Sequence, residues 1–138
     1  MSREIKEMVK PPLERDEQTA VVAWARMMAD TNQEPRLKLL RCGFEGLRLS
    51  MGVRMQCKRQ CICNGWPDLM LACPCVDFNG IEQVEYHGLF IELKRRRGGV
   101  VSDDQKYMHQ LLREQGYRVE VCRGSEAAIK CISEYLGI

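Results

Sequence analysis

Apolar residues recur at helical spacing near the start of the chain and again at its end. The first stripe comprises Ala20, Val21, Trp24 and Met28, and it predicts a helix that begins after an Asp16 N-cap. A Ser102 cap and a Gly116 stop predict a second helix. A third, predicted to be capped by Ser125, carries the stripe Ala128, Cys131, Ile132, Tyr135 and Leu136.

Short apolar runs between these segments predict strands. Residues 88–94 give the strongest signal, because Leu89, Ile91 and Leu93 point to one face while Phe90, Glu92 and Lys94 point to the other. Further strands are predicted at residues 37–42, 68–73 and 117–122, with a loop or hairpin at 74–87. A helix is also predicted over residues 50–61, inside a basic, cysteine-rich segment. This order predicts an α/β fold, a mixed central sheet flanked by helices.

Length and composition fit one globular domain. The chain has 138 residues, of which 45% are hydrophobic and 29% charged, and this argues against a disordered or fibrous protein. We expect a single domain over residues 1–138, with residues 1–13 as a flexible arm that ends at Pro11 and Pro12. We see no apolar run long enough to cross a bilayer and no signal-peptide core, so we expect a soluble protein that is not secreted.

One acid interrupts the first apolar stripe. Glu17 lies three residues before Ala20 and four before Val21, so it falls on the face that should be buried. It is either a first-turn glutamate favoured by the helix dipole or a functional group. The net charge is only +2, but Lys94, Arg95, Arg96 and Arg97 are consecutive. Such a run suits a polyanion, and it equally suits a solvated strand end.

Two acids and a lysine form the candidate chemistry. Glu92 and Lys94 are two residues apart on a strand and therefore share a face. Asp68 opens a neighbouring predicted strand, directly after a Gly-Trp-Pro turn. If the two strands pair, the carboxylates converge and need a compensating cation, for which Mg²⁺ or Mn²⁺ has the required preference for oxygen. Taken singly, each residue could equally be a surface charge or half of an ion pair.

These residues resemble a nuclease motif. Pro67-Asp68 followed by Glu92-Leu93-Lys94 matches the PD-(D/E)xK pattern, and the match extends through Gln105 and residues 116–122. The chain resembles the stand-alone, phage-type form of the VRR-NUC domain in that superfamily. The resemblance implies a restriction-endonuclease-like core. It also implies a metal-dependent, structure-specific endodeoxyribonuclease that acts on branched or four-way (Holliday) junction DNA.

The resemblance also assigns roles to residues. It makes Asp68, Glu92, Lys94 and Gln105 catalytic, and it places Mg²⁺ or Mn²⁺ on Glu17, Asp68, Glu92 and the Leu93 carbonyl. The residues expected to contact DNA phosphates are Arg95, Arg96, Arg97, Lys58 and Arg59. The relatives further imply a homodimer in the cytoplasm of a bacterial or phage-infected cell.

The cysteines leave a second hypothesis open. Reduced thiols packed as small hydrophobic groups are the default interpretation, and Cys122 and Cys131 are expected in the core. A structural zinc would instead draw four thiolates from Cys57, Cys61, Cys63, Cys73 and Cys75. The alternative function is a non-catalytic nucleic-acid-binding module, stabilised by that zinc. His109 is predicted to lie among the charged positions of its helix, without a catalytic partner.

Overall fold

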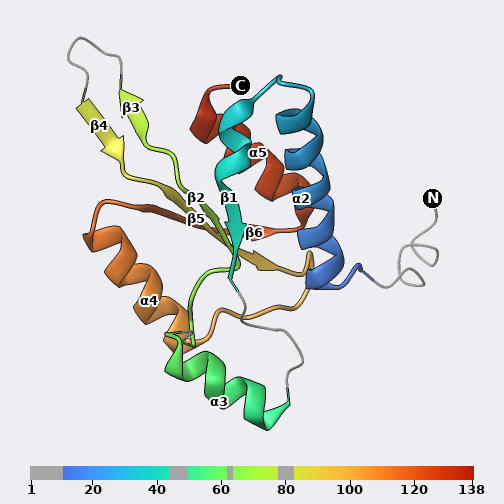
Figure 1. Cartoon of the computed structure of the whole chain (residues 1–138), viewed down its shortest axis with the longest axis vertical. Helices are drawn as coiled ribbons and strands as arrows, with labels where there is room; N and C mark the ends of the chain where they lie inside the picture. The colour runs from blue at the N-terminus through green and yellow to red at the C-terminus, as the bar shows by residue number, and fades with distance from the viewer. Residues whose placement is uncertain (1–10, 44–49, 62–63, 78–82) are drawn as a thin grey trace.

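The computed structural model describes residues 11–43, 50–61, 64–77 and 83–138. Figure 1 shows the helices and strands of the chain. In chain order they are α2 (Glu14–Asp30), the 3₁₀ helix η1 (Pro35–Leu39), β1 (Leu40–Cys42), α3 (Met51–Arg59), β2 (Leu69–Leu71), β3 (Cys75–Asp77), β4 (Gln83–Tyr86), β5 (Leu89–Lys94), α4 (Asp103–Glu114), β6 (Arg118–Arg123) and α5 (Ser125–Leu136). None of the helices within these ranges is long and apolar enough to cross a membrane.

A four-stranded mixed sheet forms the centre of the fold. Its order is β1-β2-β5-β6, with β1–β2 and β2–β5 antiparallel and β5–β6 parallel. Strands β3 and β4 form a separate antiparallel hairpin. The predicted α/β class, with a mixed sheet flanked by helices, is therefore confirmed.

Each face of the sheet packs on different helices, as the alternation along β5 predicts. Leu89, Ile91 and Leu93 belong to one buried cluster together with residues of α2 and α5. Phe90 belongs to a second cluster, with Leu112 of α4. Glu92 and Lys94 share the Phe90 face by strand periodicity. Glu92 and Lys94, the acid and the base of this strand, therefore point to the side of the sheet that α4 covers.

Several predicted boundaries were wrong. Helix α2 starts earlier than predicted, with Leu13 at the N-cap and Asp16 inside the first turn. The expected strand over residues 37–42 begins as η1, because Pro35 and the Glu34 cap favour a tight helical turn. Ser125 is the first residue of α5 instead of its cap. The predicted Ser102 cap, by contrast, is present, and the structure adds a Ser50 cap on α3.

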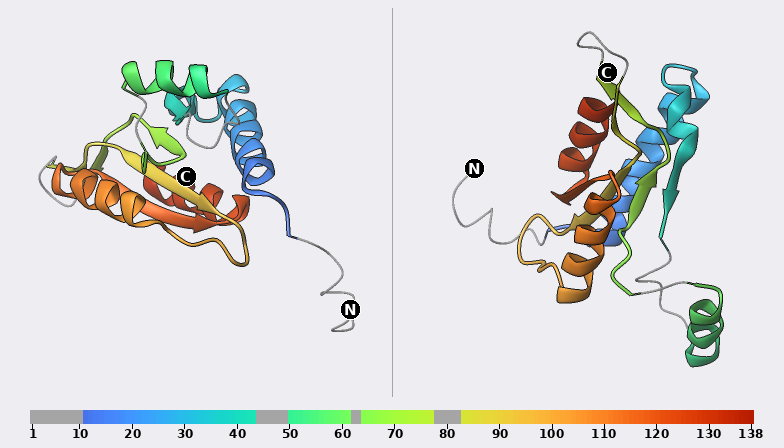
Figure 2. Two further views of the ribbon diagram at one scale, coloured as in Figure 1. Left: turned by 90° about the horizontal axis from the view of Figure 1, so that it is seen from below. Right: turned by 90° about the vertical axis from the view of Figure 1, so that its left-hand side faces the viewer.

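Helix α3 stands apart from the two buried clusters. It buries none of its residues. In Figures 1 and 2 it lies beyond the end of the sheet where α4 begins, and the β3–β4 hairpin lies at the opposite end. The same end as α3 also carries the start of α2 and the final residues of β5 (Figure 1).

Candidate active site

Asp68 and Glu92 meet across neighbouring strands. The β2–β5 pairing places Leu69 opposite Ile91 and Met70 opposite Phe90. Extending this register by one residue puts Asp68 across from Glu92, on the α4 face of the sheet. Directly opposite side chains in an antiparallel pair have Cβ atoms about 4.5–5.5 Å apart, and like charges there repel. The pairing on which the sequence argument depended is thus present.

The turn before Asp68 is held against the start of α4. Gly65 has a φ of +83°, and a Cβ at this position would lie 2.6 Å from the Asp104 carbonyl oxygen. Only glycine allows both the left-handed conformation and this close approach. Trp66 then packs edge-on against Phe90, with ring centroids 5.3 Å apart. This turn delivers Asp68 to the end of β5.

Hydrogen bonds orient each carboxylate. Asp68 Oδ2 accepts a 2.7 Å hydrogen bond from the Leu93 N–H. Glu92 Oε1 lies 3.0 Å from Lys94 Nζ and accepts a 2.7 Å hydrogen bond from Gln105 Nε2. The Gln105 side-chain oxygen also accepts from the Ser102 N–H, which completes the capping box of α4. The amide of Gln105 therefore ties the start of α4 to the acid–lysine pair.

The electrostatics of the pair are those of two acids sharing one site. Glu92 is 2% exposed. Burial first, and then the neighbouring charge of Asp68, raise the pKa of Glu92 to about 7, although Lys94 opposes the shift. Burial also raises the pKa of Asp68, against the lowering effect of the Leu93 hydrogen bond. The pair therefore retains a proton well above the ordinary range of carboxylic acids, and a cation would displace it.

Glu17 is placed elsewhere. Its Oε1 accepts a 2.9 Å hydrogen bond from Arg96 Nε, and its Oε2 accepts a 2.6 Å bond from the Ser125 N–H. Burial alone would raise the pKa of Glu17, but the hydrogen bonds from Ser125 and Arg96 outweigh it and the pKa is lowered. Glu17 thus caps α5, where a carboxylate is favoured by the exposed N–H groups and the helix dipole.

The three-acid cluster of Glu17, Asp68 and Glu92 is consequently not formed. Within the ranges that the structure describes, no group of three or more His, Cys, Asp or Glu side chains is arranged to hold a metal ion. The helical stripe correctly predicted that Glu17 is buried. It could not predict its partners, because Ser125 is 108 residues away in the sequence.

Glu14 is the acid of α2 that lies near the pair. Its charge contributes to the raised pKa of Asp68. A Cβ on Gly99 would lie 3.3 Å from Glu14 Oε1 and 3.2 Å from Lys94 Cδ, so both side chains border the same glycine. Sequence reasoning missed Glu14. The available signal was its position one helical turn before Glu17, on the same side of α2.

Comparison with known proteins identifies this arrangement. The family model described as the VRR-NUC domain matches residues 7–126. The chain belongs to the VRR-NUC family. A solved structure described as a VRR_NUC domain protein shares 24% identity with this chain, and the alignment covers 93% of this chain and 91% of that one, with a TM-score of 0.69. That likeness establishes the fold. A search of curated proteins found no match.

As a member of a nuclease family, this VRR-NUC domain carries the acids and lysine of its motif at one place. Asp68, Glu92, Lys94 and Gln105 come together, and Leu93 contributes its backbone to the same place. Lys94 is only 6% exposed. The buried ammonium beside two acids is the central electrostatic feature of the site.

The cysteines of this VRR-NUC domain are not gathered into a zinc site in the described residues. Cys57 belongs to α3 and Cys75 begins β3, and these elements lie at opposite ends of the molecule (Figure 1). Cys63 lies outside the described residues. The zinc hypothesis joined thiols that are near in sequence but separated by the fold. The prediction that Cys122 and Cys131 are buried is confirmed.

The five basic residues predicted to contact DNA phosphates differ in their position and pairing. Arg95 and Arg97 are exposed immediately after β5. Arg96 is also exposed, but it is paired with Glu17. Lys58 and Arg59 are exposed in the last turn of α3. All five therefore remain accessible to a ligand, with Arg96 partly engaged.

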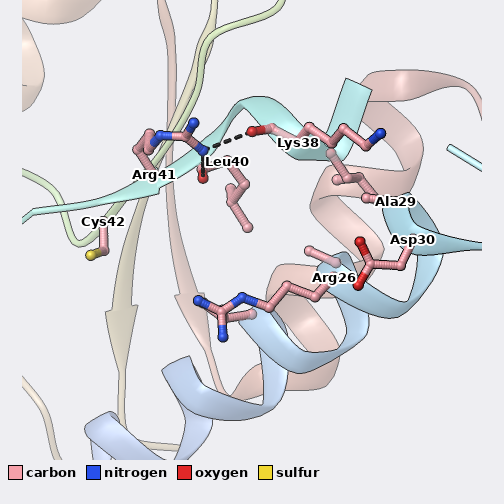
Figure 3. Close-up of a pocket in the computed structure, with 10 residues that line it drawn as sticks. Arg26, Ala29, Asp30, Lys38, Leu40, Arg41 and Cys42 are labelled. Carbon is pink, nitrogen blue, oxygen red and sulfur yellow. Dashed lines mark hydrogen bonds between the residues drawn. The ribbon is translucent and has the colours of Figure 1, made fainter. Parts of the chain in front are cut away.

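A groove between α2 and the η1–β1 segment is separate from this chemistry. It has a volume of about 440 Å³. Its apolar floor is bordered by Arg26, Lys38 and Arg41, and Arg41 Nη1 donates to the carbonyls of Lys38 and Leu40 (Figure 3). Its ten lining residues include none of those that the sequence predicts for the site. The groove therefore does not contribute to the acid–lysine centre.

Proposed function

We propose that this VRR-NUC domain is a metal-dependent endonuclease that hydrolyses DNA phosphodiester bonds at the Asp68–Glu92–Lys94 site. The observation that carries the proposal is the pairing of Asp68 and Glu92 across β2 and β5, with Lys94 Nζ 3.0 Å from Glu92 Oε1. A buried Glu92 beside a half-buried Asp68, both with raised pKa values, is an arrangement typical of functional sites. Because the chain belongs to a nuclease family, we infer that the ligand of the two acids is a divalent metal ion.

The donor set fits a hard divalent cation such as Mg²⁺ or Mn²⁺. Asp68 and Glu92 provide carboxylate oxygens, and a strand residue's N–H and C=O face the same neighbour, so the Leu93 carbonyl faces Asp68 as its N–H does. We propose Glu14 instead of Glu17 as the third acid, because Glu14 influences the pKa of Asp68 while both Glu17 oxygens are already hydrogen-bonded. The three carboxylates do not yet form a metal-holding group in the described residues, so Glu14 would have to move toward the pair when a cation binds. A bound cation would polarise a phosphodiester oxygen and lower the pKa of bound water.

The residues of the chain contribute positioning and charge. In hydrolysis, a water oxygen attacks phosphorus, the bond to the leaving oxygen breaks, and the leaving oxygen acquires a proton. Lys94 places a buried positive charge where negative charge develops on the phosphoryl oxygens. Gln105 and Lys94 both hold Glu92 Oε1, so the carboxylate keeps one orientation throughout the reaction.

Basic residues on two sides of the site are proposed to contact DNA. Helix α3 carries Arg54, Lys58 and Arg59 and no acid, and all three are exposed. Arg95 and Arg97 follow β5 directly. Seen from below, α3 and the segment between β5 and α4 lie on either side of the end of the sheet (Figure 2). A duplex or branch bound there would have its phosphates neutralised on both sides of the acid pair.

Branched DNA, including four-way junctions, is the proposed substrate class, and a homodimer the proposed form. The support is the resemblance to stand-alone, phage-type VRR-NUC domains set out above. A dimer related by two-fold symmetry would supply two sites, which paired nicks on opposite strands of a junction require.

Cleavage of a panel of linear duplexes, flaps, forks and four-way junctions tests the proposal. Each substrate is incubated with Mg²⁺, Mn²⁺ or EDTA and with the wild type, Lys94→Ala or the control Lys130→Ala, which removes an exposed lysine of α5. We expect metal-dependent cutting that Lys94→Ala reduces by about 10²–10⁴-fold and the control leaves unchanged. A folded wild type inactive on every substrate with either metal would favour the non-catalytic binding module.

Binding measurements in Ca²⁺ separate DNA contacts from chemistry. The double variant Lys58→Gln/Arg59→Gln should weaken binding and lower the slope of log affinity against log salt by about 1–2, because each phosphate contact contributes about 0.9. Lys130→Gln removes one positive charge from α5 and serves as the control. An unchanged salt slope in the double variant would exclude α3 from the DNA contact.

A further inference from the structure

His109 is buried against the motif glutamate. It lies on α4, one turn after Gln105, and only 2% of its surface is exposed. Its Nε2 lies 3.7 Å from Glu92 Oε2. Within the described residues, these two atoms are the buried side-chain nitrogen and oxygen atoms that have no hydrogen-bond partner. The prediction that His109 lies among the charged positions of its helix was wrong, because Gln105, His109 and Leu112 share the inward stripe of α4.

Helix α4 therefore donates a hydrogen bond to one carboxylate oxygen of Glu92 but not to the other. Gln105 donates to Oε1 at 2.7 Å, whereas His109 stops short of Oε2. A separation of 3.7 Å exceeds the length of a hydrogen bond. Two buried polar atoms left unpaired cost about 1–3 kcal/mol each. A shift of less than 1 Å would pair them.

The acceptor positions of the Glu92 carboxylate can be counted for the case in which His109 moves within hydrogen-bond distance of Oε2. A carboxylate offers about four acceptor positions. Lys94 and Gln105 use two on Oε1. If His109 takes a third on Oε2, one position on Oε2 remains for a ligand.

We propose that His109 is a positioning residue: its Nε2–H donates to Glu92 Oε2 and, together with Gln105 on Oε1, fixes the carboxylate so that its remaining acceptor position faces the cation. The inference rests on the proposed function, since it assumes that Asp68 and Glu92 bind a divalent cation. Outer groups of this kind orient ligands and commonly account for about 10–100-fold in metal affinity.

Three variants distinguish this role from simple core packing. His109→Leu removes the donor and keeps an apolar side chain of similar size, His109→Gln keeps an N–H donor, and Met108→Leu is the control on the neighbouring, half-buried position of α4. For each, the dissociation constant for Mn²⁺ is measured by calorimetry without DNA. The melting temperature in EDTA and the cleavage rate are measured alongside.

We expect His109→Leu to weaken Mn²⁺ binding about 10–100-fold without lowering the melting temperature in EDTA, because the metal-free protein holds no hydrogen bond at this position. His109→Gln should recover a large part of the loss, and Met108→Leu should bind Mn²⁺ like the wild type. A wild-type dissociation constant in His109→Leu would overturn the inference and leave the proposed function standing. The inference would also be overturned if His109→Leu and His109→Gln lost Mn²⁺ affinity and melting temperature to the same extent.

A second measurement needs no variant. The ¹⁵N imidazole spectrum of the wild type, with and without Mg²⁺, should show a proton on Nε2 of His109 that exchanges more slowly once Mg²⁺ is bound. A proton on Nδ1 alone in the Mg²⁺ form would overturn the inference. A wild type that neither binds Mn²⁺ nor cuts DNA would overturn the proposed function, and this inference with it.

Discussion

The acid pair predicts an unusual dependence of stability on pH in the absence of metal. Glu92 has an ordinary pKa of 4.5, and in the folded protein burial and Asp68 raise it to about 7. Between these values the unfolded chain has released a proton that the folded chain still holds. The stabilising contribution is therefore complete below pH 4.5 and is lost as the pH rises through about 7. At about 1.4 kcal/mol per pKa unit, the loss amounts to about 3 kcal/mol.

Glu92→Gln removes the titrating group and keeps the shape of the side chain. Denaturant unfolding in EDTA, at pH values between 5 and 8, gives the free energy of unfolding of both proteins. As the pH rises, the free energy of unfolding of Glu92→Gln should increase relative to that of the wild type by up to about 3 kcal/mol. Because histidines and other acids titrate in both proteins, this difference isolates Glu92.

Glu126→Gln is the matched control, since Glu126 is an exposed acid in the first turn of α5. Its stability should run parallel to that of the wild type across the same range. If the Glu92→Gln curve also runs parallel to the wild type, the carboxyl pair is not electrostatically coupled and the reasoning about the site fails.

Three further predictions concern the acids of α2 and the metal. Glu17→Ala should destabilise the protein by about 2–4 kcal/mol at pH 7 in EDTA, measured by denaturant unfolding, because it uncaps α5 and leaves Arg96 unpaired. Because the pKa of Glu17 is lowered in the folded protein, this loss of stability should shrink in acid. A loss that persists unchanged at pH 3 would contradict the assigned hydrogen bonds. Glu14→Ala should change stability in EDTA by less than about 1 kcal/mol yet weaken Mn²⁺ binding in calorimetry, and unchanged binding would remove Glu14 from the ligand set. Saturating Mn²⁺ should raise the melting temperature more at pH 8 than at pH 5.5, since binding displaces the proton of the acid pair; an equal rise at both would argue against Glu92 as a ligand.

The sequence was most informative where the structure depends on short-range periodicity. The alternation over residues 89–94 placed Glu92 and Lys94 on one face because side-chain direction in a strand repeats every two residues. The position of Asp68 opposite Glu92 needed the β2–β5 register, which is set by packing between distant segments. Here the nuclease motif supplied the missing information.

The errors concern long-range partners. A helical stripe identifies buried positions but not what they contact, so Glu17 could be recognised as buried and not as the cap of α5. His109 was predicted to lie among the charged positions of its helix, although its spacing from Gln105 and Leu112 places it on the inward stripe. The cysteines were grouped by sequence spacing, while α3 and β3 place Cys57 and Cys75 at opposite ends of the molecule.

The most direct test of the central claim is the location of a bound cation. Crystals grown with Mn²⁺ and measured at a wavelength with strong anomalous scattering from manganese would reveal it. We expect one anomalous peak with carboxylate oxygens of Asp68 and Glu92 and the Leu93 carbonyl at about 2.0–2.3 Å, on the α4 side of the sheet next to Lys94. A peak that is absent at saturating Mn²⁺, or that lies away from both carboxylates, would contradict it.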